Sequence, residues 1–132
     1  LFHILIKPSI SLSTRAMYQR IDRCGFSGRG HSFQDAICAL KKTDVEALEK
    51  NYYNIFESVL ARNGDCIDKI KALLARSGSR HSLLSGSGPT VFCTFKNKKD
   101  AGKVFKKIPK HKSRSVFLVK TYKGGIYGDN RG

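Results

Sequence analysis

The sequence contains no tryptophan, a single methionine and only three prolines in 132 residues. No apolar run approaches the ~20 residues that a membrane-spanning helix needs, so we expect no membrane partner. The four cysteines, at positions 24, 38, 66 and 93, form no Cys-x-x-Cys pair, which argues against a zinc or redox motif. We therefore expect no metal site, and mostly buried, reduced thiols in a cytosol-like compartment.

Acidic residues are scarce: 10 Asp and Glu stand against 25 Lys and Arg, a net charge of +15. The excess is uneven, since residues 1–95 carry 13 basic against 8 acidic residues and residues 96–132 carry 12 against 2. Such a field attracts nucleotides and other polyanions without specifying any of them.

Several catalytic patterns are missing. No Gly-Lys-Ser/Thr follows a glycine-rich turn, which excludes a Walker loop. None of the four histidines stands beside a convincing nucleophile. The acid pair Asp65 and Asp68 is better explained as a complement to a helix dipole. We expect no catalytic residue within this chain.

The most informative stretch that is present is residues 83–92, where a Gly/Ser segment separates two apolar runs. Gly86 and Gly88 can adopt positive φ, and neighbouring N–H groups in such a turn can form an anion-binding nest. The candidate phosphate-side loop therefore comprises Ser85, Gly86, Ser87, Gly88 and Thr90. A plain β-turn between two strands is the alternative.

Hydrophobic periodicity predicts strands over 2–7 (closed by Pro8), 81–84, 90–95 and 115–122. It predicts helices beginning near Thr14 and near Ser32, one from Thr43 to about residue 61 that ends at 63–64, and others over about 65–76 and 97–108. This order predicts one α+β domain: a small, mainly antiparallel four-stranded sheet with helices packed on one face.

Three segments in this order resemble the C-terminal half of the GHMP kinase family. They are Ile4-Leu5-Ile6-Lys7-Pro8 with residues 13–18, then Tyr53-Asn54-Ile55-Phe56-Glu57, and Leu84-Ser85-Gly86-Ser87-Gly88-Pro89-Thr90-Val91-Phe92. Val119-Lys120-Thr121 also fits, whereas Ile55 stands where the family usually has Asp. The resemblance implies that residues 1–132 form the ferredoxin-like, substrate-side domain of such a kinase.

The similarity is strongest to family members that use ATP to phosphorylate the 2-hydroxyl of a cytidine diphosphate methylerythritol in non-mevalonate isoprenoid biosynthesis. It implies that Tyr18 helps to sandwich the cytosine ring and that Thr14 contacts the substrate. It also implies that Gly86, Ser87 and Gly88 pack beside the phosphate region. An aromatic ring suits a nucleobase, because stacking contributes on the order of 1–3 kcal/mol per base. A core tyrosine and a helix-capping threonine are the alternatives.

The family's Gly-Leu-Gly-Gly-Gly-Ser type ATP loop does not occur in these residues. The resemblance places that loop, and the catalytic Lys and Asp, in an N-terminal domain that this chain lacks. It therefore implies ATP bound mainly by that domain, with Mg²⁺, and a chain that is inactive alone. Leu1 in place of an initial Met also leads us to expect a fragment of a longer protein.

Two other interpretations stay open. Homoserine- and mevalonate-type kinases share the fold, and a glycine-rich loop alone does not separate them from the cytidine-dependent kinases. A stand-alone basic module is the second alternative, since residues 96–114 hold nine Lys and Arg against one acid. Nucleic-acid binding would fall steeply with salt, but no nucleic-acid motif is present, so nucleic acid is not the expected partner.

Overall fold

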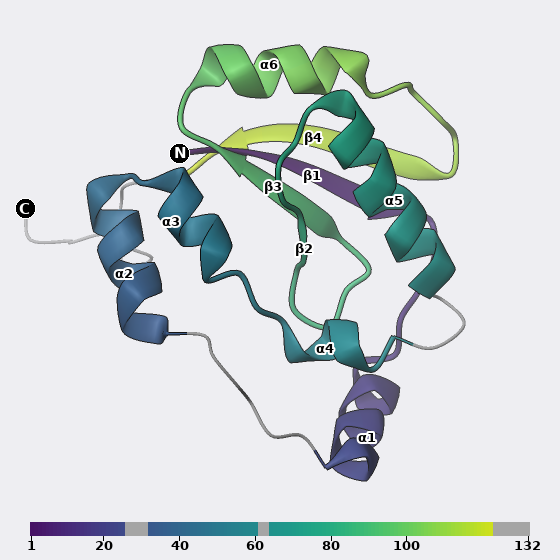
Figure 1. Ribbon diagram of the computed structural model, residues 1–132. Coiled ribbons are helices and arrows are strands. Elements are labelled where there is room, and N and C mark those ends of the chain that lie inside the picture. The colour runs from purple at the N-terminus through teal and green to yellow at the C-terminus, as the bar shows by residue number, and fades with distance from the viewer. Residues whose placement is uncertain (26–31, 61–63, 123–132) are drawn as a thin grey trace, which may run out of the picture.

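The computed structural model describes residues 1–25, 32–60 and 64–122. The elements, in chain order, are β1 (Phe2–Pro8), α1 (Thr14–Cys24), α2 (Phe33–Lys42), α3 (Val45–Lys50), α4 (Ile55–Ser58), α5 (Gly64–Ser77), β2 (Leu83–Leu84), β3 (Val91–Phe95), α6 (Lys98–Lys107) and β4 (Arg114–Lys120) (Figure 1). This arrangement confirms the predicted α+β class.

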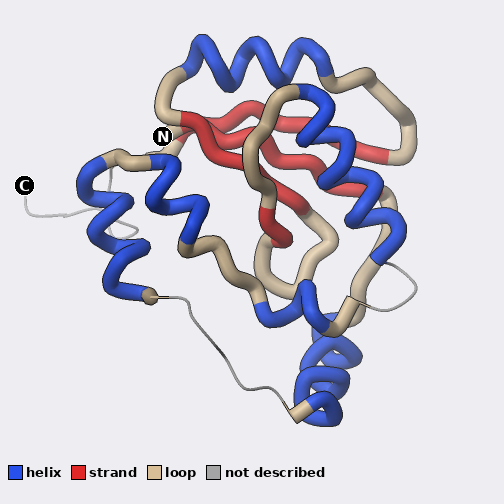
Figure 2. Tube along the Cα trace, in the orientation of Figure 1, coloured by secondary structure: helices blue, strands red, loops and turns tan. Residues whose placement is uncertain are grey.

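The four strands form one antiparallel sheet in the order β2-β3-β1-β4. Figure 2 shows them side by side in a single layer. The central strand β1 pairs with both long neighbours, and Ile4 lies opposite Cys93 on one side and Leu118 on the other. The predicted four-stranded sheet is confirmed, although β2 is only two residues long.

One face of the sheet carries the core. Ile4 and Ile6 of β1 and Val91 of β3 are fully buried, and they cluster with Leu74 of α5 and Val104 of α6. Alternation along the strands places these side chains on the same face. Helices α5 and α6 therefore cover this face, as predicted (Figure 1).

The opposite face of the sheet carries hydrogen-bonded polar side chains at its centre and solvent-exposed side chains on its edge strand. His3 bonds through Nδ1 to Thr94 Oγ1 at 3.1 Å and through Nε2 to Thr121 Oγ1 at 2.8 Å. Phe117 and Val119 of the edge strand β4 are exposed on this face.

Short polar side chains start three of the helices, as their positions predict. Ser13, Ser32 and Asn97 precede α1, α2 and α6, and each accepts a hydrogen bond from the backbone N–H three residues later. Each bond satisfies one of the N–H groups that a helix start leaves unpaired.

The prediction of one long helix from Thr43 to about residue 61 is wrong. Thr43 adopts a left-handed conformation, φ 55°, and closes α2. The side chain of Asp44 then accepts from Ala47 N and starts α3, which ends at Lys50. A new helix, α4, begins after Asn54, so the region holds two short helices.

Long-range partners explain this break. The hydroxyl of Tyr52 bonds to that of Thr94 on β3, and the side chain of Asn54 bonds to the backbone around β2. Both residues must leave the helical path to reach these partners. Gly64 begins α5 instead of ending the preceding helix, and residue 63 lies outside the described ranges.

The expectation of mostly buried cysteines is also wrong. Cys24 and Cys38 are exposed and Cys66 is half-buried, while Cys93 alone is buried. Burial raises the pKa of the Cys93 thiol to about 11. Cys24 and Cys38 lie on the outer sides of two amphipathic helices, which leaves their thiols open to solvent. No helix within the described ranges is long and apolar enough to cross a membrane.

Candidate functional site

The glycine-rich loop between β2 and β3 is closed by its own backbone. Ser85 N donates to Thr90 O at 2.8 Å, and Gly88 N donates to Ser85 O at 3.0 Å. Gly86 and Gly88 adopt positive φ values of 56° and 86°, which glycine tolerates best. The prediction that both glycines can adopt positive φ is therefore confirmed.

The surroundings of the two glycines differ. A Cβ on Gly88 would lie 2.8 Å from Leu12 Cδ1 and 3.0 Å from Leu84 Cδ1, so this position is closed by packing. A Cβ on Gly86 would meet nothing within 4 Å. Within the described residues, the N–H groups of Gly86 and Ser87 have no acceptor. The loop is therefore open at Gly86, beside two adjacent N–H groups that no described residue accepts from.

Helix α4 holds the loop from behind through Asn54. Its Nδ2 donates to Leu84 O and to Gly86 O, each at 2.7 Å, while its Oδ1 accepts from Phe56 N at 2.9 Å. One amide therefore caps α4 and fixes the carbonyls on both sides of Ser85.

Glu57 completes this support at the other end of α4. Its Oε1 accepts from Leu84 N at 2.6 Å, and its Oε2 lies 2.7 Å from Lys71 Nζ on α5. The carboxylate side chain is 25% exposed and that of Lys71 is 28% exposed. A charge-assisted bond in this partly dry position is stronger than one at the open surface.

Helix α1 also contacts the loop, through Thr14. Thr14 Oγ1 lies 2.9 Å from Ser87 Oγ, a hydrogen bond across 73 positions of sequence. Thr14 is the first residue of α1, directly after the Ser13 cap, so its backbone is already fixed. The structure therefore brings together two residues that sequence reasoning placed in one site.

Tyr18 lies one helical turn beyond Thr14, on the same side of α1. Its ring meets that of Phe56 edge to face, with centroids 5.0 Å apart and planes at 90°. Tyr18 remains 56% exposed, whereas the neighbouring Met17 is buried and anchors the helix. The exposed ring is therefore oriented but not covered, which is unlike an ordinary core tyrosine.

Sequence reasoning quoted Phe56 and Glu57 within a resembling segment without giving them a role, and it missed Lys71. The available signal was the spacing of Asn54 and Glu57, which stand at the two ends of a one-turn helix. Of the predicted loop residues, Ser85 and Thr90 close the turn through their backbones. No group of three His, Cys, Asp or Glu side chains in the described ranges could hold a metal ion.

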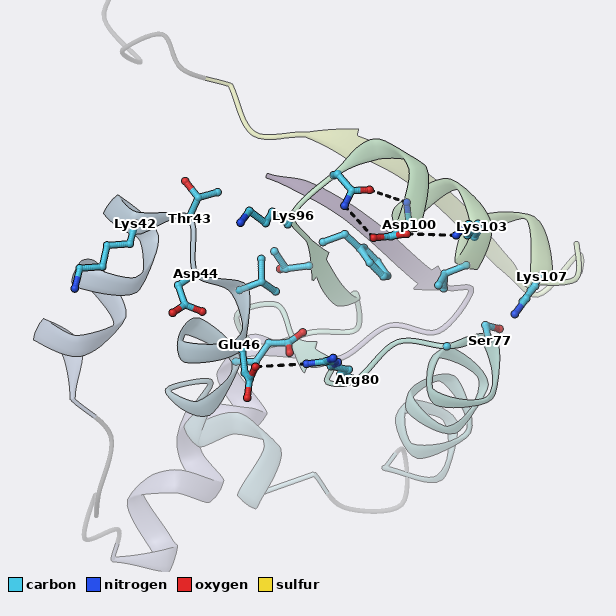
Figure 3. Close-up of a pocket in the computed structure, with 17 residues that line it drawn as sticks. Lys42, Thr43, Asp44, Glu46, Ser77, Arg80, Lys96, Asp100, Lys103 and Lys107 are labelled. Carbon is cyan, nitrogen blue, oxygen red and sulfur yellow. Dashed lines mark hydrogen bonds and ion pairs between the residues drawn. The ribbon is translucent and has the colours of Figure 1, made fainter.

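A separate cavity of about 860 Å³ lies at the opposite end of β3 (Figure 3). Its lining combines cationic and anionic side chains, and none of the predicted site residues takes part. Arg80 pairs with Glu46 at 3.7 Å, and Lys103 pairs with Asp100 at 3.6 Å. Glu49 is buried in this wall, and burial raises the pKa of its carboxyl.

Comparison with known proteins identifies the family. The model described as "GHMP kinases C terminal" matches residues 36–114, more than half of the chain. The chain belongs to the GHMP kinase family. The matched segment includes α4, α5 and the glycine-rich loop, which together form the support described above.

Individual relatives carry a more specific name. The 4-diphosphocytidyl-2-C-methyl-D-erythritol kinase of Clostridioides difficile (strain 630) is 33% identical over 93% of this chain, which covers 41% of the relative. The kinase of that name from Thermoanaerobacter pseudethanolicus is 30% identical over 93% of this chain and 42% of the relative. The chain thus spans about two fifths of the length of these curated relatives.

Solved structures support the fold of this GHMP kinase domain. A crystal structure of 4-(cytidine 5'-diphospho)-2C-methyl-D-erythritol kinase has a TM-score of 0.69 at 18% identity, over 89% of this chain and 41% of the other. Homoserine kinase from Cytophaga hutchinsonii has a TM-score of 0.59 at 17% identity, over 90% of this chain and 41% of the other. At these identities the likeness shows a shared fold alone.

Proposed function

We propose that this chain is the substrate-side, C-terminal part of a 4-diphosphocytidyl-2-C-methyl-D-erythritol kinase. The whole enzyme would use ATP to phosphorylate the 2-hydroxyl of its cytidine diphosphate substrate, a step in non-mevalonate isoprenoid biosynthesis. The names of the relatives support this activity. The observation that carries the site is the Thr14–Ser87 hydrogen bond, because it joins the helix bearing Tyr18 to the glycine-rich loop.

Each part of this cluster has a distinct role in the proposal. The exposed Tyr18 ring stacks on the cytosine, and the Thr14 hydroxyl contacts the substrate beside it. Phosphoryl transfer depends on positioning and on charge stabilisation, so donors fixed in advance suit the phosphate side. The N–H groups of Gly86 and Ser87, which have no acceptor among the described residues, would supply two such donors.

An N-terminal domain would supply the remaining machinery. We assign to it the binding of ATP with Mg²⁺ and the catalytic side chains, because these 132 residues contain no family-type ATP loop. The present chain would then be inactive without that partner. We further assign the enzyme to the cytoplasm, or to the plastid stroma in a plastid-bearing organism.

Steady-state kinetics of the full-length protein tests the assignment, with 4-diphosphocytidyl-2-C-methyl-D-erythritol and ATP as substrates. Tyr18→Ala removes the stacking ring, so KM for the cytidine substrate should rise roughly tenfold. Tyr18→Phe keeps the ring and serves as the matched control, with KM within about twofold of the unmodified enzyme. An unchanged KM in Tyr18→Ala would remove this residue from the site.

A GHMP kinase that acts on homoserine or mevalonate is the second candidate, because the shared fold does not separate these enzymes from the cytidine-dependent kinases. The same assay separates the two, because homoserine and mevalonate offer no nucleobase to Tyr18. Phosphorylation of either compound in preference to the cytidine substrate would replace the proposed activity with that of another GHMP kinase.

A further inference from the structure

A second groove lies where the end of α6 turns into β4, and it uses none of the residues assigned to the kinase site. Its volume is about 800 Å³. It is lined by Phe105, Lys106, Ile108, Pro109, Lys110, His111, Lys112, Arg114 and Val116. Among the described lining residues there is no Asp or Glu, in contrast to the mixed-charge cavity at the end of β3.

The groove has an apolar floor that continues the core. Ile108 is buried within the core cluster, and Phe105 and Val116 are partly buried hydrophobic residues that pack against it. A hydrocarbon group placed here would remove apolar surface from water, at roughly 25 cal/mol per Å².

The rim of the groove is cationic. Lys106, Lys110 and Lys112 are exposed, and none forms an ion pair with any described residue. Arg114 is fixed by a hydrogen bond from Nη2 to Pro109 O at 2.8 Å, while its Nε is buried without a partner. Native proteins rarely leave such a donor unpaired. The uncompensated positive charge favours an anion at this rim.

We propose that this groove binds an amphiphilic phosphate, a phosphate group carried on a short hydrocarbon chain. The phosphate lies among Lys110, Lys112 and Arg114, and the hydrocarbon lies on Phe105, Ile108 and Val116. A free phosphate ester and a phospholipid headgroup share this chemistry. The site is independent of the proposed kinase activity, because Thr14, Tyr18 and the glycine-rich loop take no part in it.

Isothermal titration of the full chain with hexyl phosphate tests the proposal. The double variant Lys110→Gln with Lys112→Gln removes two rim charges and should bind at least about tenfold more weakly, because bonds to charged groups are the strong ones. The double variant Lys98→Gln with Lys99→Gln removes the same charge from the other end of α6, outside the groove, and should bind as the unmodified chain does. All four lysines are exposed, so the unfolding midpoint of each variant should stay unchanged.

Three further probes identify the source of the ligand. Inorganic phosphate should bind more weakly than hexyl phosphate; equal affinity would show that the floor contributes nothing and would overturn the proposal. Co-sedimentation with phosphatidic acid vesicles but no binding of hexyl phosphate would assign the site to a lipid headgroup, and the reverse would assign it to a free ester. The proposal would be contradicted if both double variants bound hexyl phosphate equally well, or if neither hexyl phosphate nor the vesicles bound. It would also be contradicted if a single-stranded oligonucleotide displaced the bound hexyl phosphate.

Discussion

The two ends of strand β3 are held in different ways. At the end that follows the glycine-rich loop, Asn54 donates to Leu84 O and Gly86 O, and Glu57 accepts from Leu84 N. At the other end, side chains of opposite charge face one another across a cavity (Figure 3). The first arrangement fixes the course of the main chain, whereas the second leaves flexible side chains paired in water.

The ion pairs at the two ends also differ in solvent exposure, and therefore in how much they stabilise the fold. The Lys71–Glu57 pair has side chains 28% and 25% exposed, while Arg80 and Glu46 are 74% and 64% exposed. Solvent and salt weaken an exposed pair so far that it contributes little to stability. The loop end should therefore be the part of the molecule that substitutions disturb most.

The largest expected effect is that of Asn54→Ala. The change removes an N-cap and two donors to the loop, so we expect the free energy of unfolding to fall by about 2–3 kcal/mol. Asn97→Ala is the matched control at the other end of β3, where the change removes the cap of α6 and an exposed side-chain hydrogen bond to Asp100, at about 1 kcal/mol. Urea unfolding of both variants measures the difference, and equal losses would contradict the contrast.

A smaller effect is expected from Lys71→Met. Glu57 would lose its ion pair in a partly buried position, which should cost about 1–2 kcal/mol of unfolding free energy. Arg80→Met breaks the exposed pair with Glu46 and should cost less than about 0.5 kcal/mol. The same unfolding experiment in high salt should bring Arg80→Met still closer to the unmodified chain. A loss in Arg80→Met as large as in Lys71→Met would show that exposure does not separate the two ends.

The smallest effect is a pH dependence at the cavity end. Burial raises the pKa of Glu49, although His81 and Arg80 oppose the shift. The unfolded chain releases this proton more readily, so the contribution of Glu49 to stability is complete below about pH 4.5 and is lost as pH rises through the folded pKa. Glu49→Gln cannot ionise and should therefore gain stability over the unmodified chain between about pH 4 and pH 7.

The control for this prediction is Glu46→Gln. Glu46 is exposed and makes the smallest contribution to the raised pKa of Glu49, so its substitution should change the pH dependence of stability much less than Glu49→Gln does. Chemical unfolding at several pH values supplies the measurement. If the free energy of unfolding of Glu49→Gln and of the unmodified chain changed with pH in parallel, the burial of Glu49 would have no energetic consequence.

Local patterns predicted much of this fold. Alternating apolar residues located β1, β3 and β4, and short polar residues located the starts of α1, α2 and α6, where Ser13, Ser32 and Asn97 are the caps. These features depend on residues that are close together in the sequence. They could therefore be read without any knowledge of tertiary contacts.

The region from Thr43 to residue 61 could not be predicted in the same way. Its apolar spacing favours one continuous helix, yet Tyr52 bonds to Thr94 and Asn54 bonds to Leu84. Those partners lie 42 and 30 positions away, so no local pattern reveals them. The same reasoning explains why the support of the glycine-rich loop by Glu57 and Lys71 was missed.

The double contact of Asn54 has a consequence for how this part of the molecule opens. Unfolding α4 would withdraw the amide from Leu84 O and Gly86 O, and displacing the loop would leave the amide of Asn54 without acceptors. The backbone protons of Phe56 and Leu84 should therefore exchange with solvent through one shared opening event. A helix of four residues and a loop almost thirty positions away thus behave as a single cooperative unit.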